Sequence, residues 1–163
     1  MILCDFELYA LQKEHEVLDP FQYRNIQPAS IDLTLSAVFL VGGAKRVADG
    51  VYELAPGEFV LGSTTETVFV PNGYAARVEG RSSWGRKGLL IHASAGFIDP
   101  GFRGQVTLEL KNLHQVETIR LPVAERICQI TYLKMSAPAL YPYGDPQLGS
   151  HYQGQQGPTE SAT

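Results

Sequence analysis

The sequence predicts a single, mainly β domain with two short helices. Apolar runs of strand length recur along the 163 residues, and several of them alternate apolar with polar side chains. Gly, Pro, Asn and Asp residues separate these runs, as is typical of turns, and only two segments combine helix formers with capping signals. A chain of this length, with 44% hydrophobic and 18% charged residues, can bury one substantial core.

A helix, a loop and a strand are predicted in the first part of the chain. Asp5 suits the N-cap of a helix over about 6–15, with Glu7 near its positive end. Residues 19–28 read as a loop. Over 31–37 apolar residues occupy every second position with polar residues between them, which predicts a half-buried strand.

A hairpin is predicted in the middle of the chain. Strand-like runs over 65–70 and 74–78 flank the turn signal Pro71-Asn72-Gly73. Ser82 or Ser83 then caps a brief helix, which Gly88 closes in the left-handed conformation. Further strands are predicted over 89–91, 105–110, 117–121 and 126–133.

The last twenty residues differ in composition from the rest. From Gly144 onward Gly, Pro, Gln and Ser dominate and apolar residues almost vanish, so this segment cannot bury enough surface to fold alone. We therefore expect a β domain over residues 1–143 and a mobile segment over 144–163 that a ligand orders.

Composition also argues against several classes of protein. No apolar run approaches the roughly 20 residues that span a bilayer, and the first residues lack the layout of a signal peptide, so a cytoplasmic protein is expected. Cys4 and Cys128 provide no disulfide framework. The net charge of -4 argues against binding a nucleic acid polymer.

Basic side chains are nevertheless concentrated between residues 77 and 110. This stretch contains Arg77, Arg81, Arg86, Lys87 and Arg103. Such a cluster in an otherwise acidic chain indicates a small anionic ligand.

One strand combines an apolar face with a carboxylate. Because side chains alternate along a strand, Gln105, Thr107 and Glu109 share one face over 105–110, and apolar residues occupy the other. In a pocket that partly excludes water, desolvation raises the pKa of such a carboxyl group toward the working pH, where it can take a proton from water. Glu109 is therefore the candidate general base. On the pattern alone, a glutamate that merely faces solvent is the favoured interpretation.

Several blocks of the sequence resemble the dCTP deaminase family of the trimeric dUTPase-like superfamily. They occur in family order and cover nearly the whole chain, which makes the resemblance more specific than any single motif. The blocks are QPASIDL at 27–33, the stretch from Arg77 to Leu110, RICQI at 126–130, PYG at 142–144 and YQGQQGPT at 152–159.

The resemblance implies a distorted jelly-roll β-barrel, assembled as a homotrimer with active sites shared between subunits. It implies dCTP and dUTP as ligands, dTTP as a feedback inhibitor, and Mg²⁺ bound only through the triphosphate. The catalytic residues that it implies are Glu109, Ser82, Arg86 and Asp99. The substrate-binding residues that it implies are Arg81, Ser83, Ala95, Gly96, Phe97, Ile98, Gln129, Tyr143, His151, Tyr152 and Gln155.

The sequence contains no signature of a zinc deaminase. Such enzymes carry His-x-Glu and Pro-Cys-x-x-Cys, and neither pattern occurs here. The four histidines are scattered without ligand spacing, so we expect no zinc site. His92 lies within an apolar run and is interpreted as a core residue rather than a catalyst. The opening of the helix at Arg81, Ser82 and Ser83 would suit a phosphate group.

Some positions depart from the family pattern. His151 stands where the family usually has Lys, Thr34 and Ser36 replace common Arg and Gly, and the usual arginine beyond Pro158-Thr159 is missing. Each lost cation that made a buried, charge-assisted contact would weaken phosphate binding by roughly 1.5 to 3 kcal/mol.

We therefore predict a dCTP deaminase, with coupled pyrophosphate release and dUMP as the favoured product. Gly96 and Phe97 stand where deaminases that stop at dUTP often have a bulkier His-Arg pair, and Gly96 would let the chain approach the nucleotide closely. Asp99 would orient the second water. The alternatives are a deaminase that releases dUTP, a dUTPase, and a non-catalytic nucleotide-binding trimer.

Overall fold

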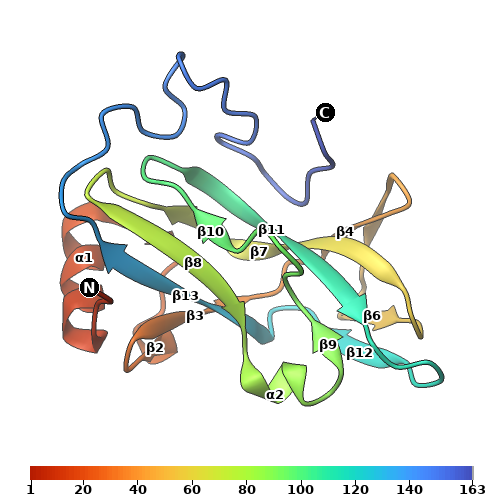
Figure 1. Cartoon of the computed structure of the whole chain (residues 1–163). Helices are drawn as coiled ribbons and strands as arrows, with labels where there is room; N and C mark the ends of the chain where they lie inside the picture. The colour runs from red at the N-terminus through yellow and green to blue at the C-terminus, as the bar shows by residue number, and fades with distance from the viewer. Residues whose placement is uncertain (163) are drawn as a thin grey trace.

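The computed structural model, which describes residues 1–162, is built from two larger sheets and a two-stranded ribbon (Figure 1). The first sheet runs in the order β5 (Ala44–Val47), β4 (Val38–Val41), β7 (Phe59–Phe69), β11 (Arg103–Asn112), β9 (Leu89–Leu90), with β1 (Leu18–Asp19) also paired to β7. The second runs in the order β10 (Phe97–Ile98), β8 (Tyr74–Gly80), β13 (Arg126–Lys134), β3 (Ser30–Thr34), β2 (Ile26–Gln27). The ribbon pairs β12 (Ile119–Pro122) with β6 (Val51–Leu54).

The mainly β prediction is confirmed, although the sheets do not close into a barrel. Both larger sheets keep open edges, and their buried side chains form one common core, with Leu33 and Ile130 from one sheet and Val60 and Leu108 from the other. Within the described residues, no helix is long and apolar enough to cross a membrane.

The predicted hairpin around residues 71–73 is wrong. The turn is present, since Tyr74 N–H donates to Pro71 O at 2.9 Å. However, β7 pairs with β11 and β8 pairs with β13, so the turn carries the chain from one sheet to the other. Turn residues specify a change of direction, and the partner of each strand is decided by packing.

The strand predicted over 31–37 is shorter and more buried than expected. All five residues of β3 are buried, including Asp32 and Thr34. Their polar atoms are satisfied inside the protein, because Asp32 pairs with two arginines and Thr34 donates to Glu66. The alternation of apolar and polar residues over 31–34 therefore does not separate a solvent-exposed face from a buried face.

The helices begin elsewhere than predicted. Helix α1 (Asp5–His15) has Cys4 as its N-cap instead of Asp5, and Glu7 accepts a hydrogen bond from Cys4 N–H at 2.9 Å. Helix α2 (Ser82–Gly85) has Arg81 as its N-cap instead of a serine. Gly88 has the predicted positive φ, at 76°. The predicted loop over 19–28 contains β2 and a 3₁₀ turn (Tyr23–Asn25).

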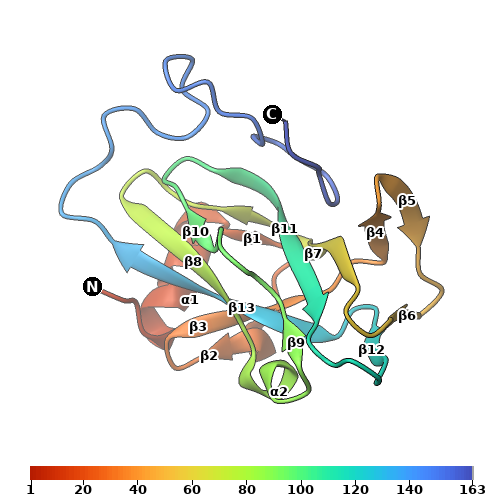
Figure 2. The same cartoon turned by 45° about the vertical axis from the view of Figure 1, so that its right-hand side comes forward.

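The tail has no helix or strand within residues 144–162, yet it follows the surface of the domain. In Figures 1 and 2 it passes over the end of the molecule where β10 and β11 meet. Its contacts with β11 place it at the candidate site.

Candidate active site

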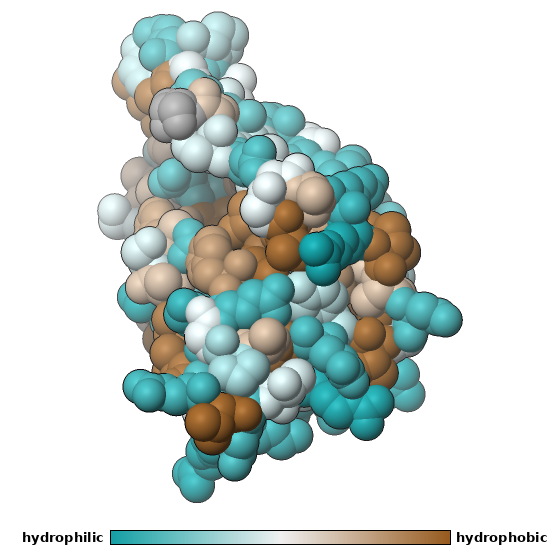
Figure 3. Space-filling view, turned by 90° about the vertical axis from the view of Figure 1, so that its right-hand side faces the viewer, coloured by the Kyte–Doolittle hydropathy of each residue, from teal (hydrophilic) through white to brown (hydrophobic). Residues whose placement is uncertain are grey.

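A cavity of about 520 Å³ lies between β11, the loop before β10 and the tail. Such a volume suits a small molecule. Apolar surface is exposed beneath the overhanging tail on the face shown in Figure 3. The cavity brings together eight of the residues named from the sequence, namely Glu109, Asp99, Ala95, Phe97, Ile98, Tyr143, Tyr152 and Gln155.

Glu109 is held by β11 and by the loop that follows β9. As predicted, the residues of β11 alternate, and Glu109 lies on the partly exposed face while its neighbours Leu108 and Leu110 are buried. Its Oε2 atom accepts a hydrogen bond from Ala93 N–H at 3.1 Å. The carboxylate is therefore oriented by a rigid strand and a backbone donor.

His92 is a residue of this site that the sequence interpretation assigned only to the core. Its side chain is 9% exposed, and Nδ1 lies 3.9 Å from Oε2 of Glu109. No hydrogen-bond partner for Nδ1 is found among residues 1–162. Burial lowers the pKa of His92, while Glu109 opposes this shift. The only hint in the sequence that His92 belongs to the site was its position, directly before the loop that contains Ala95.

Gly96 is required by the protein's own backbone. A Cβ atom here would lie 2.7 Å from Val78 O, and Val78 N–H donates to Gly96 O at 2.8 Å. The loop is thereby held against β8. This close approach explains the glycine without the contact to a nucleotide that the sequence suggested.

Asp99 lies in the turn between β10 and β11. The turn is held in place by Tyr143, whose N–H donates to Pro100 O at 2.7 Å. The Tyr143 ring also packs edge-on against Phe102, with centroids 5.6 Å apart. Tyr143, the last residue before the tail, therefore holds in place the backbone of the turn from which Asp99 lines the cavity.

The tail is attached to β11 chiefly through Gln105. Gln105 N–H donates to Gln155 O at 3.1 Å, and Gln155 Nε2 donates to Gln105 O at 2.5 Å. Gly157 N–H donates to the side-chain Oε1 of Gln105 at 2.5 Å. Tyr152 N–H donates to the hydroxyl of Tyr143 at 3.0 Å. These bonds place the tail over the cavity, whereas His151 is exposed and does not line it.

Other residues named from the sequence lie outside the main cavity. Arg81, Ser82 and Gly96 line a second hollow of about 280 Å³, which adjoins the first at His92. Arg86 lines a third hollow. Ser83 and Gln129 line none of these three hollows. Gln129 instead accepts a hydrogen bond from Ser30 Oγ at 3.1 Å. One chain alone therefore does not join Ser82 and Arg86 to Glu109.

The basic residues between 77 and 110 do not form one patch. Arg77 pairs with Glu79 at 2.5 Å, and Arg103 stacks over the ring of Phe69 at 4.3 Å. None of the described residues that line the main cavity is Lys or Arg. With only four residues, α2 also has too few aligned peptide units for a strong dipole. The predicted phosphate site at its start must therefore rely on side chains.

Carboxylates are the charged groups of the main cavity. Asp99 and Glu109 are joined there by Glu160 from the tail. No group of three His, Cys, Asp or Glu side chains within residues 1–162 is arranged to hold a metal ion.

Comparison with solved structures identifies the dUTPase-like class of fold. The chain superposes on the 2'-deoxycytidine 5'-triphosphate deaminase from Agrobacterium tumefaciens with a TM-score of 0.67 and 21% identity, covering 80% of this chain and 47% of that one. It also superposes on a mutant dUTPase from phage phi11 of S. aureus with a TM-score of 0.54 and 19% identity, covering 75% of this chain and 86% of that one. At these identities the likeness shows the fold alone.

The sequence comparisons are more specific. Residues 2–135 match the family model described as dCTP deaminase-like. The chain is 45% identical to a protein of Thermobifida fusca and 41% identical to one of Pseudarthrobacter chlorophenolicus, over 99% of this chain and 92% and 94% of the relatives. Both relatives are named "dCTP deaminase, dUMP-forming". This chain therefore belongs to the dCTP deaminase-like family.

Proposed function

We propose that this chain hydrolyses dCTP to dUMP, ammonia and pyrophosphate. The observation that carries the proposal is that two carboxylates on adjoining elements, Glu109 on β11 and Asp99 in the preceding turn, face the same cavity. Two hydrolyses need two positioned waters, and each carboxylate can orient one of them. The names of the relatives support this product.

In the first reaction Glu109 acts as general base. Ala93 N–H donates a hydrogen bond to its Oε2 atom, and Oε1 can then bind a water that is directed at C4 of cytosine. The water oxygen bonds to C4 while its proton passes through Glu109 to ring nitrogen N3. The second proton of the water passes by the same carboxylate to the amino group. The C4–N bond then breaks, ammonia leaves, and a carbonyl group remains at C4.

In the second reaction Asp99 orients a water toward the α-phosphorus. The water oxygen bonds to phosphorus, and the bond to the oxygen that bridges the α- and β-phosphates breaks. Pyrophosphate leaves with that electron pair, and Asp99 accepts the proton. In-line attack of this kind depends on position, since a displacement of about 1 Å can cost a hundredfold in rate.

The functional assembly is a homotrimer in this proposal, with each site shared between copies. Two observations support sharing: no Lys or Arg of the described residues lines the cavity of Glu109, and Ser82 lies in the adjoining hollow. A second copy would supply Ser82, Arg86 and Arg81 to stabilise the reacting water and the phosphates. Mg²⁺ arrives with the triphosphate as part of the substrate, and dTTP is the expected feedback inhibitor.

Product analysis tests the proposal. The purified protein is incubated with each deoxynucleoside triphosphate and Mg²⁺, and the products are separated by anion-exchange chromatography. Equal amounts of dUMP, ammonia and pyrophosphate from dCTP support it. Accumulation of dUTP reduces the chain to a deaminase, and turnover of dUTP alone makes it a dUTPase. Binding without turnover indicates a nucleotide-binding trimer.

A further inference from the structure

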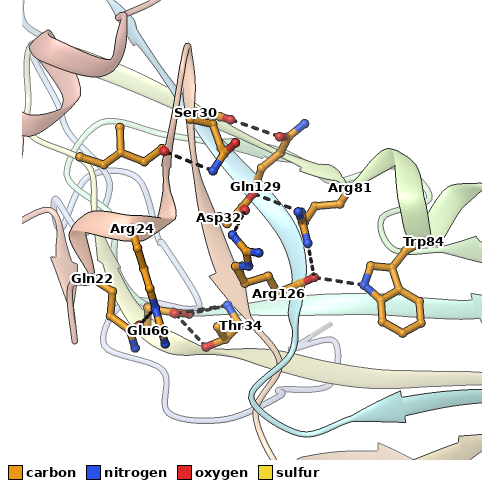
Figure 4. A network of polar contacts seen from close by, with 12 residues as sticks. Gln22, Arg24, Ser30, Asp32, Thr34, Glu66, Arg81, Trp84, Arg126 and Gln129 are labelled. Atoms are coloured by element: carbon orange, nitrogen blue, oxygen red, sulfur yellow. Dashed lines mark hydrogen bonds and ion pairs between the residues drawn. The ribbon is translucent and has the colours of Figure 1, made fainter.

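A buried carboxylate lies behind the second hollow. Asp32 on β3 has a side chain that is 1% exposed, and it contacts two guanidinium groups (Figure 4). Its Oδ1 atom lies 3.3 Å from Nε of Arg81, and its Oδ2 atom lies 3.2 Å from Nη1 of Arg126. A buried charge is tolerated only with such partners, so this pairing is an obligatory part of the fold.

The guanidinium of Arg81 is fixed at more than one point. Its Nη1 atom donates to the backbone oxygen of Arg126 at 3.2 Å, and Trp84 Nε1 donates to that same oxygen at 3.1 Å. The Arg81 backbone N–H donates to Ile127 O at 3.2 Å. The side chain is 26% exposed and lines the hollow with Ser82. It is therefore rigid and accessible at the same time.

The charges and donors leave Arg81 able to bind an anion. One carboxylate against two guanidinium groups leaves one positive charge in the Asp32, Arg81 and Arg126 cluster. A guanidinium has five N–H donors, and the contacts described for Arg81 within residues 1–162 use two of them. Three donors remain for oxygens of a ligand in the hollow.

We propose that Asp32 is a positioning residue, which aims the guanidinium of Arg81 at a phosphate of the substrate. This inference rests on the proposed function. Asp32 itself is too deeply buried to touch the nucleotide, and it acts by removing the rotational freedom of Arg81 before the substrate arrives. Preorganised side chains bind more tightly because less conformational entropy is lost on binding.

The variant Asp32→Asn tests this role, since it keeps the size of the side chain and removes its charge. We expect KM for dCTP to rise about tenfold while kcat changes less than about threefold, because a charge-assisted contact is weakened and Glu109 is untouched. In a Glu109→Gln background, the loss of affinity measured by calorimetry should be larger for dCTP than for dCMP. A purely structural role would lower the amount of active enzyme and leave KM unchanged.

Glu66→Gln provides the matched control. Glu66 is 3% exposed and hydrogen-bonded to Thr34, and no described contact joins its side chain to Arg81. Removing its charge should leave KM for dCTP at the wild-type value. If Asp32→Asn does not fold, Asp32→Glu keeps the charge and displaces the guanidinium, so the same rise in KM is expected.

The outcomes separate this inference from the function on which it rests. A wild-type protein that does not turn over dCTP overturns both. A wild-type enzyme that turns over dCTP, with a folded Asp32 variant of unchanged KM, overturns the positioning role alone. A rise in KM of equal size in Glu66→Gln also overturns it, because any buried carboxylate would then have the same effect.

Discussion

Oε2 of Glu109 lies 3.9 Å from Nδ1 of His92 and accepts the backbone N–H of Ala93 at 3.1 Å. One oxygen of the carboxylate is thus committed to the loop that carries His92, and the other is available for water. The conformation of this loop therefore sets the direction in which the carboxylate of Glu109 points.

Replacing Glu109 with Gln should separate binding from deamination. We expect Glu109→Gln to bind dCTP yet release ammonia at least about a hundredfold more slowly, because positioned acid–base groups typically contribute about 10² to 10⁴ in rate. Calorimetry measures binding and a coupled ammonia assay measures turnover. Near-normal ammonia release would remove Glu109 from the mechanism.

Replacing Asp99 with Asn should change the product. The variant retains Glu109, so deamination of dCTP should continue within about threefold of the wild-type rate. Pyrophosphate release should fall roughly a hundredfold, because an amide at this position no longer orients the second water as a carboxylate would. Chromatography of the reaction should then show dUTP in place of dUMP. Continued formation of dUMP at the wild-type rate would assign the second hydrolysis to another group.

Deleting the tail from Gly149 onward should weaken nucleotide binding and leave the domain folded. Residues 149–162 contribute no strand or helix, but Tyr152 and Gln155 line the cavity. We expect KM for dCTP to rise roughly tenfold or more, since closing segments exclude water and order the substrate. Circular dichroism and gel filtration check the fold. Normal turnover by the truncated protein would show that the tail is not a lid.

The buried Glu66 should make stability depend on pH. Burial raises the pKa of Glu66, and hydrogen bonds from Thr34 oppose the shift only in part. The folded protein then holds this proton to a higher pH than the unfolded chain. The free energy of unfolding should therefore fall as pH rises above about 4.5, by up to ~1.4 kcal/mol per pH unit for one proton.

Urea unfolding of Glu66→Gln between pH 4.5 and 7 measures this contribution. The variant should lack the fall in stability that Glu66 causes. The exposed Glu125 provides a control, because Glu125→Gln should leave the pH dependence as in the wild type. Parallel curves for the wild type and Glu66→Gln would show that Glu66 is ionised equally in the folded and unfolded states.

Local patterns predicted the elements better than their arrangement. The alternation over 105–110 predicted β11, and it placed Glu109 on the partly exposed face. The same reasoning failed for β3, because Asp32 and Thr34 find partners far along the chain, in Arg126 and Glu66. Polarity along a strand does not reveal a buried partner contributed by another strand.

The site required a resemblance as well as physical reasoning. Composition and spacing indicated a carboxylate on a strand and an anionic ligand, and the family blocks supplied the predicted roles of Ala95 and Gln155. The proximity of His92 to Glu109 depends on how the loop after β9 packs against β11 and β8, which no local pattern encodes.

The attachment of the tail to β11 of the same chain would make the predicted closing a unimolecular event. Gln155 follows Tyr143, which is hydrogen-bonded to Pro100 of the domain, by only 12 residues, so its local concentration near the cavity is set by tether length and not by the amount of protein. In the proposed homotrimer, dilution that separates the copies should thus remove the groups proposed to come from a second chain, while the tail still closes. Loss of activity on dilution and loss of closure would then be separate events, each with its own dependence on concentration.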